Sequence, residues 1–347
     1  VLCAQWLGKP ADEAHFSVTD WSVLPMVTSG DPYVMSQADQ DRLQTNPAWT
    51  PSYCSPSSAS NSAYYFSHST REAARLIFDH GLWPAAMAIW QSGPGGGQAA
   101  PLVVRREDAR WVEGGLTAAG MEVLSLERLA KQLYQMGGIA GAAVHVFNRW
   151  QWAEADFTLS GNSERLPIDG LAVRNAGGEF KTLPRNQVYY PPTQRNNAAV
   201  TYYSAVGTLA EVAVDIATGQ VELLNHHSIM ECGNLIVPEL VSGQLQGGLA
   251  MGIGHALHEY LPLYEDGPGN GTWNFNRYHL PRASDVAVWK QTDDILPALS
   301  ETDPPKGMAE VVMIPVVAAL VNAIADATGH RFRDLPVRAE NIREVLQ

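Results

Sequence analysis

Residues 243–259 constrain the fold most, because five glycines interrupt a segment that otherwise predicts a helix. They are Gly243, Gly247, Gly248, Gly252 and Gly254. Each glycine inside a helix costs about 1 kcal/mol relative to alanine. We therefore expect close approach by a ligand or another backbone, or tight packing against a second helix. The sequence leaves these explanations open.

The rest of the C-terminal half predicts strands followed by a helix. Residues 201–216 alternate apolar and polar side chains, which is typical of a strand. Thr218 and Gly219 predict a turn, and residues 220–224 a return strand. A final helix is expected from Pro315 to Gly329, because proline favours the first turn of a helix and glycine its end.

The N-terminal half mixes helices, strands and a polar loop. Helices are expected to end at 1–8 and to form at 69–80, with a capping signal at 69–72, and at 125–136. Strands are expected at 15–18 and 144–157, with further strands and turns at 156–197. A loop is expected at 31–62 and a flexible break at 93–101. Because the chain opens inside a helix, it is expected to be the second half of something larger.

Composition excludes several classes of function. The net charge is −13 and Lys and Arg do not cluster, which argues against nucleic-acid binding and favours small-molecule substrates. Cys3, Cys54 and Cys232 form no Cys-x-x-Cys pair, which argues against a disulfide framework, a structural zinc site or an iron–sulfur cluster held by this chain alone.

Residues 311–325 are too short and interrupted to span a membrane, and no signal peptide is recognised, so a cytoplasmic or periplasmic location is expected.

Glu310 is the first candidate for chemistry. It follows Lys306-Gly307-Met308-Ala309 and precedes an apolar run, so its carboxylate has small and apolar neighbours. A buried carboxylate with a perturbed pKa is a candidate general base. Alternatively, Glu310 caps the helix or pairs with Lys306.

Other motifs give weaker signals. His255 and His258 lie one helical turn apart and could bind a metal, but the Glu follows them rather than lying between them as in zincins. The hydroxyl-rich turn at residues 58–62 and the glycine-rich helix entered through Gln244 could let a phosphate or a pterin approach closely.

These segments, in this order, resemble the C-terminal half of the molybdenum-binding large subunit of the xanthine dehydrogenase / aldehyde oxidoreductase family of molybdenum hydroxylases. The matching motifs are Ser58-Ala59-Ser60-Asn61-Ser62, Gly243-Gln244-Leu245-Gln246-Gly247-Gly248, Lys306-Gly307-Met308-Ala309-Glu310 and Asn322-Ala323-Ile324-Ala325-Asp326-Ala327-Thr328-Gly329. Ala309 replaces the usual Gly, Val311-Val312 the usual Pro pair, and residues 236–238 the usual Asn-Pro.

The resemblance implies an α+β fold, a C-terminal molybdopterin-binding domain with mixed β-sheets packed against helices and completed by another chain. Residues 1–100 would carry the first part of the binding region, with the cofactor turn at 57–62. Residues 101–200 would be a variable strand region, and residues 201–347 the second binding region. The family's Phe-Gly loop and Gly-Gln-Gly turn are missing, so a second molybdopterin-binding chain or an N-terminal half is expected to complete the cradle.

The resemblance also implies a cofactor and roles for residues. Molybdopterin cytosine dinucleotide would hold molybdenum with oxo, sulfido and hydroxo ligands. Glu310 would take the proton from the hydroxo ligand. Ala59 would leave room beside the metal, Ser58, Ser60, Asn61 and Ser62 would contact the cofactor, and Gln244 would contact its dinucleotide tail.

The expected function is hydroxylation of an aldehyde or an N-heterocycle such as xanthine, with water as the oxygen source. The resemblance implies partner chains that carry [2Fe–2S] clusters and FAD or haem, because electrons must leave the molybdenum. Two alternatives remain: a non-catalytic scaffold subunit that completes the molybdenum site of a partner, and a metal-independent binding protein.

Overall fold

The computed structural model describes residues 1–15, 20–30, 34–52, 58–92, 104–148, 151–191, 203–261, 274–282 and 291–347. Contacts divide the chain into two compact units. The first comprises Val1–Pro56 and Tyr65–Thr201, and the second comprises Ser57–Tyr64 and Tyr202–Gln347. The small-residue turn at 58–62 therefore belongs with the C-terminal unit, although more than a hundred residues separate them in sequence.

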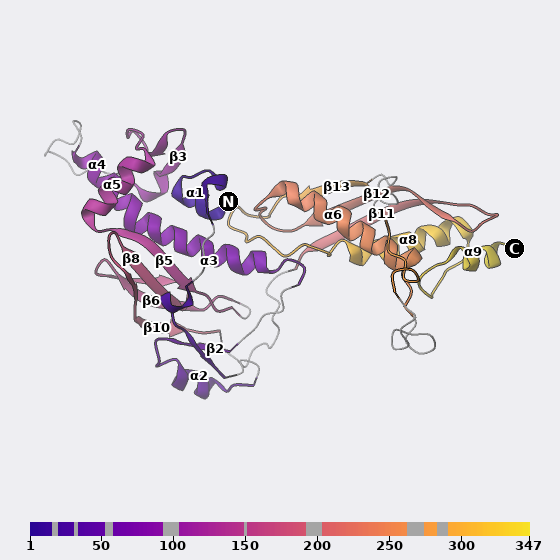
Figure 1. Cartoon of the computed structure of the whole chain (residues 1–347), viewed down its shortest axis with the longest axis horizontal. Helices are drawn as coiled ribbons and strands as arrows, with labels where there is room; N and C mark the ends of the chain where they lie inside the picture. The colour runs from indigo at the N-terminus through magenta and orange to yellow at the C-terminus, as the bar shows by residue number, and fades with distance from the viewer. Residues whose placement is uncertain are drawn as a thin grey trace. The chain divides into compact units, whose positions relative to one another are not determined.

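The first unit is built from small sheets and helices (Figure 1). One antiparallel sheet has the order β10-β6-β7 and another the order β5-β8-β9. The strands of these two sheets are β5 Ile139–His145, β6 Glu154–Leu159, β7 Asn162–Leu166, β8 Gly170–Asn175, β9 Phe180–Thr182 and β10 Arg185–Tyr189. Two smaller sheets have two strands each: β1 Val27–Ser29 pairs with β2 Trp49–Pro51, and β3 Arg110–Val112 pairs with β4 Gly115–Thr117. The α-helices are α1 Leu2–Leu7, α2 Gln37–Leu43, α3 Ser62–Ile77, α4 Trp83–Ser92 and α5 Leu126–Met136, and the first three residues of α3 belong to the second unit.

A buried polar network ties the first unit together. The Asp169 carboxylate is fully buried and accepts hydrogen bonds from Thr50 Oγ1 at 2.8 Å and Tyr190 OH at 3.0 Å, and it pairs with His145 Nδ1 at 2.7 Å. Burial alone would raise the pKa of Asp169, but the His145 charge and these hydrogen bonds together lower it. Arg185 donates to the carbonyl oxygens of Asn46, Trp49 and Asp169, which holds the β1–β2 region to the sheets.

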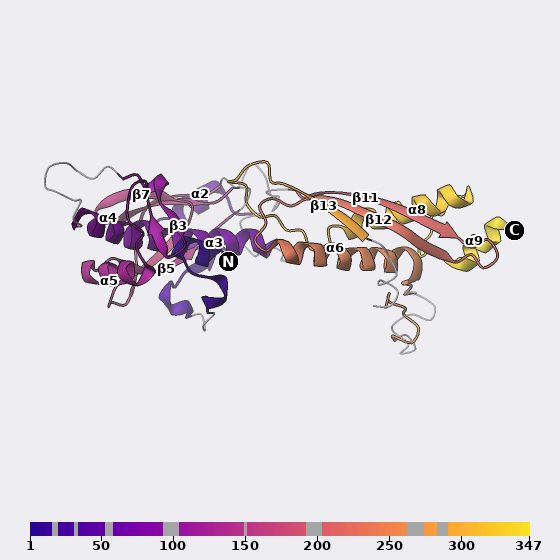
Figure 2. The same cartoon turned by 90° about the horizontal axis from the view of Figure 1, so that it is seen from above.

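The second unit is a mixed sheet whose inner face is covered by helices (Figures 1 and 2). Strand β12 (Val221–Glu231) pairs antiparallel with β11 (Ala205–Val214) and parallel with β13 (Gln291–Leu296). Helix α6 (Pro238–Ile253), the π-helical segment Gly254–His258, and helices α8 (Met313–Thr328) and α9 (Ala339–Leu346) complete the unit. In β11 half-buried and exposed residues alternate, because only one face of this sheet is covered.

Packing of α6 against α8 explains part of the glycine-rich pattern. A Cβ atom on Gly248 would lie 2.2 Å from Val312 Cγ1, and one on Gly252 would lie 2.5 Å from Val316 Cγ1. Both glycines are therefore required by helix–helix contact within the chain. A Cβ atom on Gly243 or Gly247 would have no heavy atom within 4 Å, so internal packing does not explain these two.

Several predicted elements are confirmed. Gly8, Gly137 and Gly329 end helices α1, α5 and α8 in the left-handed conformation. The helix predicted at 125–136 is α5, which begins after its N-cap residue Ser125, and β11 and β12 form the predicted hairpin around Gly219.

Other predictions are wrong or incomplete. The expected loop at 31–62 contains α2 and β2, and the helix expected from residue 69 begins at Ser62. Ser69 does not cap that helix, because its hydroxyl donates to the Phe66 carbonyl within it. The expected strand at 144–157 is instead the end of β5 and the start of β6. The strand at 15–18, except His15, and the whole break at 93–101 lie outside the described residues. Within the described part, no helix is long and apolar enough to cross a membrane.

Candidate functional site

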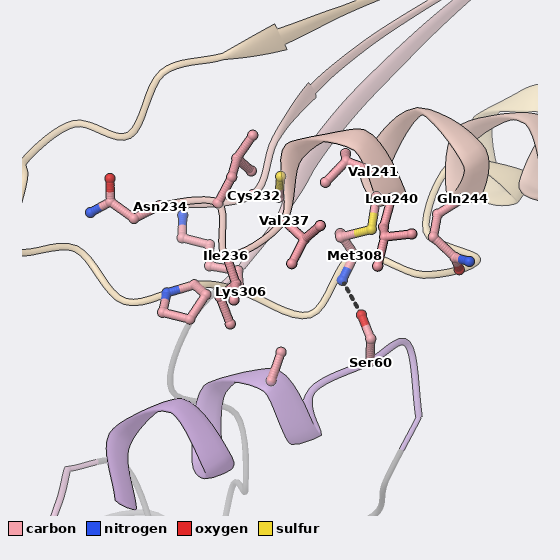
Figure 3. A pocket seen from close by; sticks show the side chains of 13 residues that line it. Ser60, Cys232, Asn234, Ile236, Val237, Leu240, Val241, Gln244, Lys306 and Met308 are labelled. Carbon is pink, nitrogen blue, oxygen red and sulfur yellow. Dashed lines mark hydrogen bonds between the residues drawn. The ribbon is translucent and has the colours of Figure 1, made fainter. Parts of the chain in front are cut away.

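The small-residue turn and the segment before α8 are joined by one hydroxyl group. Ser60 Oγ accepts hydrogen bonds from the backbone N–H groups of Met308, at 3.1 Å, and Ala309, at 3.2 Å. Figure 3 shows the Ser60 side chain directed at the Met308 backbone. The structure thus brings two of the predicted site segments into contact, within the second unit.

Gly307 allows this contact. A Cβ atom at Gly307 would lie 2.6 Å from the Ala59 carbonyl oxygen and 2.8 Å from the Asn61 nitrogen, so a larger residue would push the two segments apart. The Gly307 carbonyl oxygen accepts a hydrogen bond of 2.7 Å from Ser204 Oγ, just before β11. Glycine is therefore needed here for close backbone approach.

Lys306 is held by an ion pair that sequence reasoning missed. Its ammonium group donates to the Glu231 carboxylate at the end of β12 and, at 3.1 Å, to the Tyr203 carbonyl oxygen. Burial by itself would raise the pKa of Glu231, but the Lys306 hydrogen bond and charge and the Gly233 N–H together lower it. The pair is mostly buried, with side-chain exposures of 16% for Lys306 and 14% for Glu231.

The loop that leads to Lys306 is fixed by Asn234. The Asn234 amide nitrogen donates to the carbonyl oxygens of Ser300, Glu301 and Asp303, at 3.0, 3.1 and 2.7 Å. The Lys306 N–H donates to the Cys232 carbonyl oxygen at 3.0 Å. The segment from 300 to 309 is thus tied to the end of β12 and to the turn at 58–62.

A cavity of about 360 Å³ opens where these segments meet. Figure 3 shows it between the first turns of α6, the end of β12 and Ser60. Its apolar wall consists of Leu235, Ile236, Val237, Leu240, Val241 and Met308. Its polar groups come from Ser60, Asn234, Gln244 and Lys306, with the Cys232 thiol beside them. Such a mostly apolar cavity with a few polar groups is typical of a small-molecule site.

Glu310 lies at the surface of the chain, which corrects the expectation of a buried carboxylate. Its carboxylate has no hydrogen-bond or ion-pair partner among the residues that the structure describes. It does not pair with Lys306, which binds Glu231, and it does not cap α8, whose N-cap residue is Val312. The carboxylate therefore remains available to a group outside these residues.

The backbone around the candidate residues is strained. The described chain has four non-glycine residues with positive φ, and three of them are Ala59 (51°), Ser60 (53°) and Glu310 (65°). Such a conformation costs of order 1–3 kcal/mol and persists only where the surroundings impose it. Its concentration in two contacting turns is typical of a functional site.

The remaining predicted cofactor-binding residues are Gln244 in α6 and the other residues of the turn at 58–62, and they differ in exposure. Gln244 is exposed and lines the cavity from α6. Ser58 is exposed, and Ala59, Asn61 and Ser62 are half-buried in the turn. Gly243 and Gly247 lie on the same exposed side of α6 as Gln244, because residues three or four apart share a helix face.

Sequence reasoning missed Glu231, Asn234 and Ser204, which hold the site segments. The only available signal was Cys232-Gly233-Asn234 after a strand, where Gly233 adopts a φ of 71°. His226 and His227 face opposite sides of β12: His226 is buried and His227 is partly exposed. Within the described chain, no group of three or more potential metal-ligating side chains occurs.

Comparisons with known proteins bear on this site. The chain is 31% identical over 139 residues to one subunit of the nicotinate dehydrogenase of Pseudomonas putida, covering 40% of this chain and 11% of that subunit. It is 30% identical over 146 residues to one subunit of a probable xanthine dehydrogenase of Bacillus subtilis, covering 42% of this chain and 19% of that subunit. It is 26% identical over 211 residues to the carbon monoxide dehydrogenase large chain of Hydrogenophaga pseudoflava, covering 55% of this chain and 26% of that large chain. The chain thus spans about a quarter or less of these curated relatives.

A solved structure supports the fold. Quinoline 2-oxidoreductase from Pseudomonas putida matches with a TM-score of 0.53 and 20% identity, covering 85% of this chain and 30% of that one. This likeness confirms the α+β architecture. Residues 41–287 match the molybdopterin cofactor-binding domain family, and this range includes the turn at 58–62 and Gln244. The resemblance seen in the sequence is therefore confirmed, and the chain belongs to the family of molybdopterin cofactor-binding domains.

Proposed function

We propose that this chain is a molybdenum-cofactor-binding catalytic subunit of a multi-subunit hydroxylase, with Glu310 as its general base. The observation that carries the proposal is the hydrogen-bonded contact between the turn at 58–62 and the segment that ends at Glu310. Membership of the cofactor-binding family supports the part that concerns the turn at 58–62 and Gln244, which lie in the matched range 41–287. Glu310 lies outside that range, and its role rests on the resemblance of residues 306–310.

The residues present fit a large planar cofactor. The cavity beside Ser60 offers about 360 Å³, an apolar wall, and amide and hydroxyl groups that can donate hydrogen bonds. Gly243 and Gly247 leave open space on the exposed side of α6, next to Gln244. In this proposal Ser58, Ala59, Asn61, Ser62 and Gln244 contact the cofactor, and Ser60 lines the cavity beside it. When bound, molybdopterin in its cytosine dinucleotide form supplies the redox chemistry.

Glu310 would hold and move a proton. Its carboxylate is unpaired among the described residues and lies directly after the segment fixed by Ser60. As a base, Glu310 would accept a proton on a carboxylate oxygen when water-derived oxygen is transferred to an aldehyde or an N-heterocycle such as xanthine. Because Glu310 is exposed in this chain, the proposal requires further protein to cover it and exclude bulk water.

The proposal includes partners. A second molybdopterin-binding region would complete the cradle, and partner chains with [2Fe–2S] clusters and FAD or haem would carry electrons away. All three of the relatives named above are described as parts of larger enzymes: the large chain of a carbon monoxide dehydrogenase, and subunits of a nicotinate dehydrogenase and of a probable xanthine dehydrogenase. These names support an assembly of several chains.

Substitution of Glu310 tests the proposal. Glu310→Gln in the complete complex is expected to retain molybdenum but to lower turnover by about 100-fold or more, the range for loss of a general base. Molybdenum content is measured by elemental analysis, and turnover with aldehyde and N-heterocycle substrates and an artificial electron acceptor. Glu301→Gln, an exposed residue of the preceding loop, serves as the matched control. Turnover per molybdenum near the wild-type value in Glu310→Gln would refute the role as base.

The exposure of Glu310 also favours a second candidate, a non-catalytic scaffold subunit that completes a partner's site. In that case Glu310→Gln would leave turnover unchanged, while removal of the chain from the complex would lower its molybdenum content. The same measurements therefore separate the two functions.

A further inference from the structure

The hydrogen bonds of Ser60 point to a role other than contact with a ligand. We propose that Ser60 is a positioning residue, whose hydroxyl group sets the conformation of the turn that presents Glu310. The inference rests on the proposed function, because it concerns how the candidate base is held. It assigns Ser60 a task that the sequence motif does not indicate.

The hydroxyl group is already occupied on its acceptor side. Ser60 Oγ accepts hydrogen bonds from the backbone N–H groups of Met308, at 3.1 Å, and Ala309, at 3.2 Å. These two bonds use both lone pairs of the hydroxyl oxygen. Only the Ser60 proton is left to donate. Ser60 can therefore offer a ligand one hydrogen bond while it holds the two residues that precede Glu310.

The same short segment is held from its other side. Ser204 Oγ donates to the Gly307 carbonyl oxygen, and the Lys306 N–H donates to the Cys232 carbonyl oxygen. After the turn, the Glu310 carbonyl oxygen accepts the Met313 N–H at 3.0 Å, which leads into α8. These contacts fix the chain on both sides of Glu310, and Ser60 binds the backbone N–H groups of the two residues that precede it.

This fixation matters because Glu310 is in the left-handed region, with φ at 65°. A non-glycine residue keeps such a conformation only when its surroundings impose it. Without the Ser60 oxygen, the N–H groups of Met308 and Ala309 lose their partner and the turn can relax. The Glu310 carboxylate would then change direction, and misplacement of a base by about 1 Å can cost a large factor in rate.

Two variants separate the hydroxyl group from the backbone conformation. Ser60→Ala removes the hydroxyl but keeps a side chain at a positive φ of 53°, whereas Ser60→Gly removes the hydroxyl and also relieves that strain. In the complete complex, both are expected to speed hydrogen exchange of the Met308 and Ala309 amides by roughly tenfold, the scale of the lost hydrogen bonds. Ser69→Ala, whose hydroxyl bonds within α3, should leave these rates unchanged.

Kinetics of the same variants complete the test. We expect kcat per bound molybdenum to fall roughly tenfold or more in both variants, with KM and molybdenum content at wild-type values. Unchanged exchange of both amides would overturn the proposal, as would faster exchange in Ser60→Ala alone. A lower molybdenum content with normal turnover per molybdenum would also overturn it, because Ser60 would then be a cofactor contact. Failure of the proposed function is recognised separately, by normal turnover of Glu310→Gln.

Discussion

Gly247 and Gly248 are neighbours in α6, and the structure predicts opposite effects when each is replaced by alanine. A Cβ atom at Gly247 would have no heavy atom within 4 Å, while a Cβ atom at Gly248 would lie 2.2 Å from Val312 Cγ1. The two substitutions are chemically identical and adjacent in sequence. They therefore isolate packing against α8 from helix propensity.

The magnitudes follow from two terms. Alanine in place of glycine inside a helix stabilises by about 1 kcal/mol, so Gly247→Ala should raise the free energy of unfolding by that amount. Gly248→Ala gains the same term but overpacks the contact with Val312, which is 1% exposed and stiff about χ1. Overpacking costs about 1–3 kcal/mol, so Gly248→Ala should lower the free energy of unfolding by up to about 2 kcal/mol.

Urea unfolding of the purified chain, followed by circular dichroism, measures both values. We expect the free energies of unfolding of the two variants to differ by about 1–3 kcal/mol, with the midpoint of Gly247→Ala above the wild-type value and that of Gly248→Ala below it. If both variants stabilise the chain equally, then α6 and α8 do not pack as described. In the complete complex Gly247→Ala also shows whether anything lies against the exposed side of α6, because the added methyl group would then impair cofactor loading or assembly.

Two further predictions concern buried titratable groups. Asp169→Asn should lower the free energy of unfolding by about 3–5 kcal/mol, because it breaks the buried ion pair with His145 and weakens the hydrogen bond from Thr50. Thermal unfolding measures this loss, with the exposed substitution Asp12→Asn as the control. His226 is 2% exposed, and burial, with a smaller effect of the His227 charge, lowers its pKa to about 4. The unfolded chain binds that proton at about pH 6.5, so stability should fall by up to about 3 kcal/mol as the pH drops from about 6.5 to 4. His226→Leu should flatten this fall in urea titrations at each pH, and an equally steep fall in the variant would contradict the assignment.

Local signals in the sequence predicted much of the fold. Glycine in the left-handed conformation ends three helices at the expected residues, because this conformation is inexpensive only without a side chain. The hairpin of β11 and β12 follows from alternation and from Gly219, whose φ is 72°. Short elements in polar segments were missed, since contacts with distant residues stabilise them: Leu43 of α2 packs against the core of the first unit, and Arg185 donates to the Trp49 carbonyl oxygen in β2.

The candidate site was less predictable, because its contacts join distant residues. Lys306 and Glu231 are 75 residues apart, and Ser60 and Met308 are 248 apart. Motif matching named both segments but could not show that they touch or that Glu231, rather than Glu310, binds Lys306. Nor could it distinguish Gly247 from Gly248, because the difference depends on which side of α6 faces Val312.

The most direct test of the account is a structure of the complete complex with its cofactor bound. We expect the pterin to lie against the turn at 58–62 and Gln244, and the Glu310 carboxylate to lie within hydrogen-bonding distance of a ligand of the molybdenum. A structure in which Glu310 points to bulk solvent, far from the pterin, would contradict the central claim that this carboxylate is the base.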